Sequence, residues 1–166
     1  MRILICVPTF ETITPDTFRS IYNLDKGDNE VDFDFVRGYD CATARNYIAQ
    51  KAIDGNYDYV LMVDNDVILP SSSLLLLLEH NVDVVFGYYA HRNNSNTYEG
   101  NTCACRLARE DGSLYFNYDI ESQYAGSELR QMAQEGIKLV EIHGGGMGCA
   151  LIRTSVFNQM VYPWFD

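Results

Sequence analysis

The sequence predicts an α/β fold in which a mostly parallel sheet carries flanking helices. Segments with the apolar patterns of strands alternate with segments of helical periodicity over residues 1–90, as in sheets whose strands are joined by helical crossovers. The length of 166 residues suits one domain, so we expect a single domain over residues 1–166. Apolar residues make up 47% of the chain and charged residues 21%, which excludes disordered and collagen-like chains.

The first four elements have clear local signals. Residues 2–7 form an apolar run that predicts a buried strand, and we expect Pro8 to end it. The Thr-Pro pair at residues 14–15 is typical of the N-cap and first turn of a helix. Residues 31–36 alternate apolar and acidic side chains, which predicts a half-exposed strand. Apolar residues recur at helical spacing over residues 40–54, which predicts a helix.

The rest of the chain continues this alternation. We expect strands at residues 59–63, 82–88, 139–142 and 149–152, helices at 71–80 and 127–134, and irregular strands or a hairpin within 90–123. The serines at the start of the helix over 71–80 are available as caps. Ligands of such sheets bind beyond the carboxyl ends of the strands, so that edge is where we expect a site.

Charge restricts the partners of the protein. Twelve basic and 23 acidic residues give a formal net charge of −11. A field of that sign repels phosphates, so we expect no nucleic-acid partner. A small anionic ligand requires a divalent cation, local arginines or helix N-termini.

Cysteine usage and hydropathy indicate the compartment. The five cysteines are odd in number and scattered, which favours reduced thiols over a disulfide framework. The longest aliphatic run, residues 74–78, is far too short for a transmembrane segment, and the N-terminus lacks the pattern of a secretory signal. We therefore expect a cytoplasmic protein.

The strongest chemical signal is Asp64-Asn65-Asp66, directly after the strand over residues 59–63. Two carboxylates in a D-x-D motif can share a hard divalent cation with phosphate oxygens, although a strand-ending turn often has the same residues. An EF-hand loop is excluded because Ile68 and Leu69 stand where an oxygen ligand and a glycine are needed.

Two further features are candidates for ligand contacts. Arg45 lies early in a predicted helix and could pair with a diphosphate through its bidentate fork, or be an ordinary solvated arginine. Four glycines follow His143 within five positions, and such a segment lets backbone approach a ligand closely. His143 itself is a candidate metal ligand or sugar contact, or simply a hydrogen-bonded histidine.

The order of these motifs along nearly the whole chain resembles the GT-A glycosyltransferases, in particular bacterial family 2-like members. The motifs are Val7-Pro8-Thr9-Phe10, then Gly38 with Ala44-Arg45-Asn46, then Asp64-Asn65-Asp66, then Gly146-Met147-Gly148 leading into a strand. The resemblance implies a Rossmann-like nucleotide-diphospho-sugar transferase fold. It implies a metal-dependent, hexosyltransferase-like enzyme that uses Mn²⁺ or Mg²⁺, with a UDP- or GDP-sugar as donor and a glycan or other hydroxyl group as acceptor.

The resemblance and the motifs together predict the roles of single residues. We expect the nucleotide to contact Pro8, Thr9, Glu11, Arg45, Asp64 and Asn65, the metal to contact Asp66, Asp64 and the candidate ligand His143, and the donor sugar or acceptor to contact Gly145 and Gly146.

The resemblance is incomplete at the end of the chain. Inverting members place a catalytic carboxylate in a Glu-Asp motif after an aromatic stretch, whereas this sequence stops at Trp164-Phe165-Asp166. We expect a truncated chain whose two terminal aromatic residues lack cover and whose catalytic base lies beyond Asp166. Glu141 and Asp119 are the candidate bases if it does not. The alternative function is a non-catalytic nucleotide-sugar or glycan-binding module, and the stereochemical course, inverting or retaining, stays open.

Overall fold

The computed structural model describes residues 1–89, 101–106 and 123–166, which belong to two compact units. The first unit comprises Met1–Gly87 and Met147–Asp166, and the second comprises Tyr88–Gly146. The second unit is thus inserted into the chain of the first. The expectation of a single domain stays a prediction, which the excision experiment in the Discussion tests.

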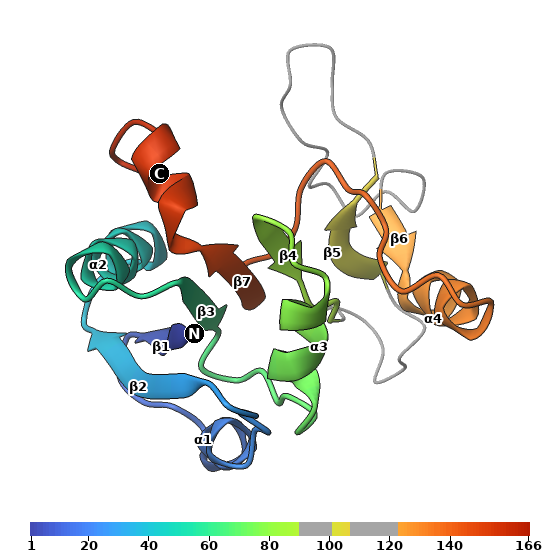
Figure 1. Cartoon of the computed structure of the whole chain (residues 1–166), viewed down its shortest axis with the longest axis horizontal. Coiled ribbons are helices and arrows are strands. Elements are labelled where there is room, and N and C mark those ends of the chain that lie inside the picture. The colour runs from blue at the N-terminus through green and yellow to red at the C-terminus, as the bar shows by residue number, and fades with distance from the viewer. Residues whose placement is uncertain (90–100, 107–122) are drawn as a thin grey trace. The chain divides into compact units, whose positions relative to one another are not determined.

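The described elements follow the predicted alternation of strands and helices (Figure 1). In chain order they are β1 (Arg2–Thr9), α1 (Pro15–Tyr22), β2 (Glu30–Arg37), α2 (Cys41–Asp54), β3 (Tyr59–Val63), α3 (Ser73–Glu79), β4 (Val84–Phe86), β5 (Asn101–Cys105), β6 (Gln123–Ala125), α4 (Gly126–Gln134), β7 (Cys149–Arg153) and the 3₁₀ helix η1 (Thr154–Gln159).

The first unit contains a five-stranded sheet in the order β2-β1-β3-β7-β4. Strand β1 is parallel to β2 and β3, whereas β7 is antiparallel to both of its neighbours, β3 and β4. The α/β class and the mostly parallel sheet with flanking helices are therefore confirmed. The antiparallel strand between β3 and β4 is a feature that the sequence did not indicate.

Helix α2 and η1 cover one face of this sheet. Alternate side chains of β1, β3 and β7 point to that face, as the two-residue period of a strand requires. The buried cluster there consists of Leu4, Cys6, Ile48, Ala49, Ala52, Val60, Met62, Ala150, Ile152 and Phe157. Helix α1 packs on the opposite face, where the ring of Phe18 meets that of Phe33 on β2 with centroids 5.9 Å apart. Both sheet faces are thus covered by helices within the first unit.

Two local details of the first unit differ from the predictions. Strand β1 continues through Pro8 to Thr9. Because β3 pairs with β1 only from Ile3 to Cys6, the missing N–H of Pro8 costs no bond on that side. Serine does not cap α3, because Ser72 has helical backbone angles and its side chain makes no capping hydrogen bond.

The second unit confirms a hairpin but not a predicted strand. Strands β5 and β6 pair antiparallel. Strand β5 lies within residues 90–123, where irregular strands or a hairpin were expected, whereas β6 begins at the last of these residues and runs on to Ala125. Residues 139–142 do not form a strand. The nearest pairing is a single bridge between Gly144 and Cys105, so the glycine segment takes the place beside β5. The apolar pattern of 139–142 was therefore misread, and Leu139 is exposed.

The chain end is packed, contrary to the expectation that its aromatic residues lack cover. The rings of Trp164 and Phe165 lie 5.4 and 6.2 Å from the ring of Phe157, centroid to centroid. The indole N–H of Trp164 donates a hydrogen bond to the backbone oxygen of Phe157 at 2.9 Å. The expectation was wrong because η1 turns the chain back and supplies the covering side chain itself.

The cysteines and the helices agree with the expectations on disulfides and membrane segments. All five cysteines are described and all are free thiols. Burial raises the pKa of Cys6 to about 12 and that of Cys149 to about 11, so both thiols are protonated at neutral pH. In the parts of the chain that the structure describes, every helix is too short or too polar to cross a bilayer.

Candidate functional site

The predicted ligand residues of the first unit gather at one edge of the sheet. Strands β1, β2 and β3 run in the same direction, so their carboxyl ends share an edge. Thr9 ends β1, Arg37 ends β2, and Asp64 directly follows β3. The backbone N–H of Gly38 donates to the carbonyl oxygen of Thr9 at 3.1 Å, which joins the first two ends.

Arg45 reaches this edge from α2. The carboxylate of Asp40 caps the helix by accepting from the backbone N–H of Thr43 at 2.9 Å, which places Arg45 just past the first turn. Nη2 of Arg45 donates to Oδ1 of Asp64 at 3.0 Å. The side chains of Arg45 and Asp64 are only 17% and 33% exposed, so the ion pair is partly shielded from water. The structure therefore joins two residues that stand 19 positions apart.

The same arginine keeps one donor unused. Its Nε–H is buried and has no hydrogen-bond partner among the described residues. A buried donor without an acceptor costs about 1–3 kcal/mol, so such a group calls for an explanation. An oxygen of an anionic ligand is one acceptor that could satisfy it.

The backbone around Asp64 is held by the end of the glycine segment. The N–H of Asp64 donates to the carbonyl oxygen of Gly148 at 3.0 Å, and the carbonyl oxygen of Asp64 accepts from the N–H of Val67 at 3.1 Å. The second bond closes a turn over Asn65 and Asp66, both of which are half-buried. Gly148, the last glycine of the predicted segment, thus contacts the D-x-D motif at this edge.

Asn65 and Thr9 brace the loop between β1 and α1. Nδ2 of Asn65 and Oγ1 of Thr9 both donate to the carbonyl oxygen of Thr12, at 2.9 and 2.6 Å. The carbonyl oxygen of Asn65 accepts from the N–H of Thr14 at 3.0 Å. These supporting roles were not predicted; the bond of Asn65 joins residues 53 positions apart, whereas that of Thr9 spans only three. Contact with a nucleotide stays a prediction for both side chains.

The other predicted residues of this edge differ in exposure. Pro8 is buried in β1, whereas Glu11 is exposed on the loop that Asn65 braces. Asp64 and Asp66 offer the carboxylate oxygens that Mn²⁺ and Mg²⁺ prefer. No group of three or more His, Cys, Asp or Glu side chains that could hold a metal occurs among the described residues. The roles of Asp64 and Asp66 toward a metal therefore stay predictions.

The remaining predicted residues belong to the second unit. His143 is exposed and its backbone N–H donates to the carbonyl oxygen of Cys105 at 2.9 Å. A Cβ on Gly146 would overlap the hydroxyl of Tyr89 and the side chain of Cys103, so packing alone requires glycine there. The roles of His143, Gly145 and Gly146 toward a ligand stay predictions, as does that of the exposed Glu141. Asp119 lies outside the described residues.

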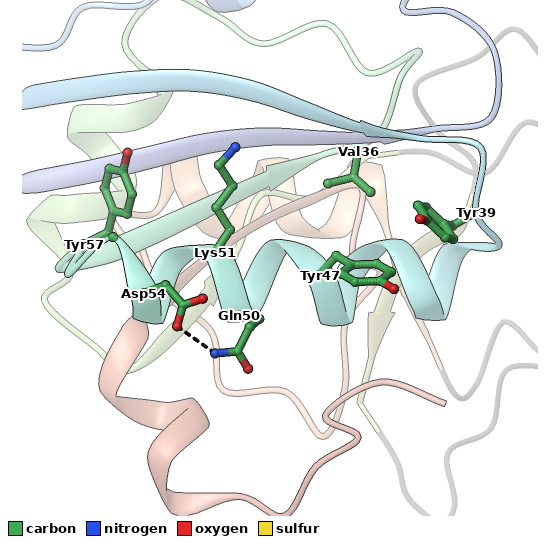
Figure 2. Close-up of a pocket in the computed structure, with 8 residues that line it drawn as sticks. Val36, Tyr39, Tyr47, Gln50, Lys51, Asp54 and Tyr57 are labelled. Atoms are coloured by element: carbon green, nitrogen blue, oxygen red, sulfur yellow. Dashed lines mark hydrogen bonds between the residues drawn. The ribbon is translucent and has the colours of Figure 1, made fainter.

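A shallow groove along α2 was not predicted (Figure 2). Its lining residues are Val36, Tyr39, Tyr47, Gln50, Lys51, Asp54, Gly55 and Tyr57, and we call it the tyrosine groove. The spacing of the α2 members, at 47, 50, 51 and 54, is that of one helical stripe and could have indicated a shared face. What the sequence did not show is that the residues before and after the helix extend that stripe.

Comparisons with known proteins show a structural likeness but no match in sequence. No family model and no curated protein matches the sequence. The chain is similar to the crystal structure of A197 from STIV, a viral protein, with a TM-score of 0.58 and 19% sequence identity. The match covers 100% of this chain and 72% of A197. At this identity the likeness shows that the two chains share a fold.

Proposed function

We propose that the protein is a metal-dependent GT-A glycosyltransferase that moves a sugar from a nucleotide-diphosphate donor to a hydroxyl acceptor. The observation that carries the proposal is the contact between Arg45 and Asp64 at the carboxyl edge of the parallel strands, beside Asp66. A cation and two carboxylates at that edge are the groups that a metal–diphosphate complex needs.

Arg45 would bind the diphosphate. It already orients Asp64 through Nη2, and its buried Nε–H is still without a partner among the described residues. A phosphate oxygen at Nε would satisfy this donor, and a charge-assisted bond of this kind is stronger than a neutral one. Arg45 would thus hold the leaving group and Asp64 at the same time.

Asp66 and Asp64 would hold the cation. A bound Mn²⁺ or Mg²⁺ supplies charge neutralisation at the diphosphate as the glycosidic bond breaks. The cation would also reduce the repulsion between the diphosphate and a protein whose formal net charge is −11. A general base would take the proton of the acceptor hydroxyl.

Isothermal titration calorimetry tests the metal and nucleotide assignments. We expect UDP or GDP to bind at least about tenfold more tightly with Mn²⁺ than with EDTA. Asp66→Asn should remove this difference, and Arg45→Lys should weaken binding because an ammonium cannot replace the guanidinium fork. Asp28→Asn, an exposed carboxylate on a loop, is the matched control and should bind as the wild type does. Equal affinities with and without metal would contradict the proposal.

Donor turnover then distinguishes a transferase from a binding module. The substrate is the sugar nucleotide whose diphosphate binds, with and without added glycan acceptor. Transfer or slow hydrolysis that Asp66→Asn abolishes supports an enzyme. Tight metal-dependent binding without any turnover by this chain supports the non-catalytic nucleotide-sugar-binding alternative.

A further inference from the structure

The tyrosine groove lies on the face of α2 that is turned toward β2, outside the cluster of Arg45 and Asp64. Tyr57 stands at one end of the groove, Tyr39 and Tyr47 stand at the other, and Lys51 lies between them (Figure 2). The rings of Tyr39 and Tyr47 are in contact, with centroids 4.8 Å apart, and the two residues are 46% and 52% exposed. The groove therefore presents aromatic surface to solvent at the Tyr39–Tyr47 end, whereas Tyr57 at the other end is half-buried.

The Tyr57 end of the groove is held in place. The hydroxyl of Tyr57 donates to Asp32 at 2.6 Å, and the guanidinium of Arg2 lies 4.7 Å from the centroid of its ring. Gly55 lets Tyr57 fold against the end of α2, because a Cβ at that position would overlap the ring. A ring fixed in this way loses little conformational entropy when a ligand packs on it.

The middle of the groove is polar, and its lysine is already paired with a carboxylate. Lys51 forms an ion pair with Asp34 of β2. Nε2 of Gln50 donates to Oδ1 of Asp54 at 2.9 Å. Gln50 and Lys51 keep further N–H donors, and the carboxylates keep further lone pairs. The lining therefore offers hydrogen bonds without an uncommitted positive charge among its described residues.

This chemistry disfavours two other classes of occupant. A phosphate-bearing or acidic ligand would be repelled by three carboxylates in or beside the groove, those of Asp32, Asp34 and Asp54. Lys51 is the one cation among the lining residues, and it is already paired with Asp34. An extended peptide would pair with the outer edge of β2, but that strand carries the charged residues Glu30 and Arg37 as well as two aspartates. Charged side chains on an edge strand oppose the addition of another strand.

We propose that the tyrosine groove binds a neutral oligosaccharide of hexopyranose units. The C–H groups on one face of a pyranose ring can pack on an aromatic side chain. The hydroxyls of the sugar can donate hydrogen bonds to a carboxylate such as that of Asp54, and can accept them from an amide such as that of Gln50. Open ends let the chain of sugars continue past the groove in both directions. The inference deepens the proposed function and rests on it in one respect: the bound oligosaccharide would be part of the acceptor.

Saturation-transfer NMR with neutral oligosaccharides tests the groove without nucleotide or metal. The probes are gluco-, manno- and galacto-oligosaccharides of about four to six units, offered to the full chain at about 1 mM. When the aromatic protons of the protein are saturated, we expect the saturation to pass to the C–H protons on one face of the sugar rings of at least one probe. Tyr47→Ala and Tyr39→Ala should each weaken that binding about tenfold, whereas Tyr47→Phe, which keeps the ring, should retain it.

The control is Tyr22→Ala, which removes a tyrosine that is 74% exposed on α1, on the other side of the sheet. Binding should be unchanged in this variant. The proposal is overturned if no probe binds, if Tyr47→Ala binds as the wild type does, or if Tyr22→Ala weakens binding equally. If the chain binds an oligosaccharide but shows no metal-dependent nucleotide binding, the proposal for the groove is supported and the proposed transferase function is contradicted. The two proposals can therefore fail separately.

Discussion

Asn46 uses both ends of its amide to join two distant parts of the chain. Its Oδ1 accepts from the backbone N–H groups of Trp164 and Phe165, at 2.8 and 3.2 Å. Its Nδ2 donates to the carbonyl oxygens of Phe165 and Ala42, at 2.7 and 3.0 Å. Asn46 is 7% exposed, and a buried amide with all these bonds specifies one arrangement of its neighbours. Its neighbour in the sequence, Arg45, points to Asp64 instead.

Replacing Asn46 by alanine should release the C-terminal segment. The change leaves part-buried backbone groups of Trp164 and Phe165 without the partners that Asn46 provides, so we expect the free energy of unfolding to fall by about 2 kcal/mol. Trp164 is the single tryptophan, so its emission should shift to longer wavelength as water reaches it. Urea unfolding and fluorescence measure both effects. Gln50→Ala, an exposed amide on the same helix, should change neither; an Asn46→Ala protein with native stability and emission would disprove the clamp.

At the scale of elements, α2 connects the features described above. One helix presents Arg45 to the D-x-D edge, Asn46 to the C-terminal segment and Tyr47 to the groove. Three successive residues can do so because each step around a helix turns the side chain by about 100°. The start of this helix at Asp40 therefore sets the position of all three.

Removing the cap of α2 should affect both stability and ligand binding. The hydrogen bond from the side chain of Thr43 is the main cause that lowers the pKa of Asp40 below its usual value of 3.8. A carboxyl group whose pKa is lower in the folded than in the unfolded protein stabilises the folded state when the pH is above its unfolded-state pKa. This stabilisation is lost as the pH falls through the pKa of the group in the folded protein. Asp40→Ala should lower the melting temperature at pH 7 and weaken Arg45-dependent nucleotide binding.

Asp40→Asn is the matched control, because asparagine keeps a capping oxygen but has no charge to titrate. It should retain nucleotide binding. The difference in melting temperature between the wild type and Asp40→Asn, measured by circular dichroism from pH 7 to 3, should shrink below about pH 4. A difference that grows on acidification would show that the cap does not act through its charge.

At the scale of the whole molecule, the second unit is an insertion whose two ends meet in the first. The N–H of Gly87 donates to the carbonyl oxygen of Cys149 at 2.9 Å, and Phe86 pairs with Ala150. The chain thus leaves the sheet from β4 and returns along the antiparallel neighbour β7. Two adjacent antiparallel strands are the arrangement that a short hairpin loop can connect.

Replacing Tyr88–Gly146 by an Asn-Gly turn should leave the first unit folded. Its sheet, both helix layers and the Asn46 clamp all lie within Met1–Gly87 and Met147–Asp166. We expect cooperative urea unfolding, native-like circular dichroism and unchanged Trp164 emission. A chain that unfolds without a cooperative transition would instead support the single domain that the length predicts.

The sequence by itself determined the elements whose signals are local. Thr14 was readable as a helix start from the Thr-Pro pair, and α2 was readable from its apolar spacing. In the structure the side chains of Thr14 and Asp40 each accept from a backbone N–H three residues ahead. The strands β1, β2 and β3 were readable from their apolar periods, and the D-x-D motif followed from its place after β3. The prediction of a strand at residues 139–142 was wrong, because this apolar segment has no strand beside it to pair with among the described residues.

Only the tertiary structure decided which distant segments meet. The antiparallel place of β7 between β3 and β4 joins strands from opposite ends of the chain. The pair of Arg45 with Asp64, the cover that η1 gives to Trp164 and the groove between α2 and β2 also depend on how the helices are seated on the sheet. The burial of apolar surface drives such contacts. Residues that are buried together can stand at any separation along the chain, so no periodic pattern in the sequence reveals which of them meet.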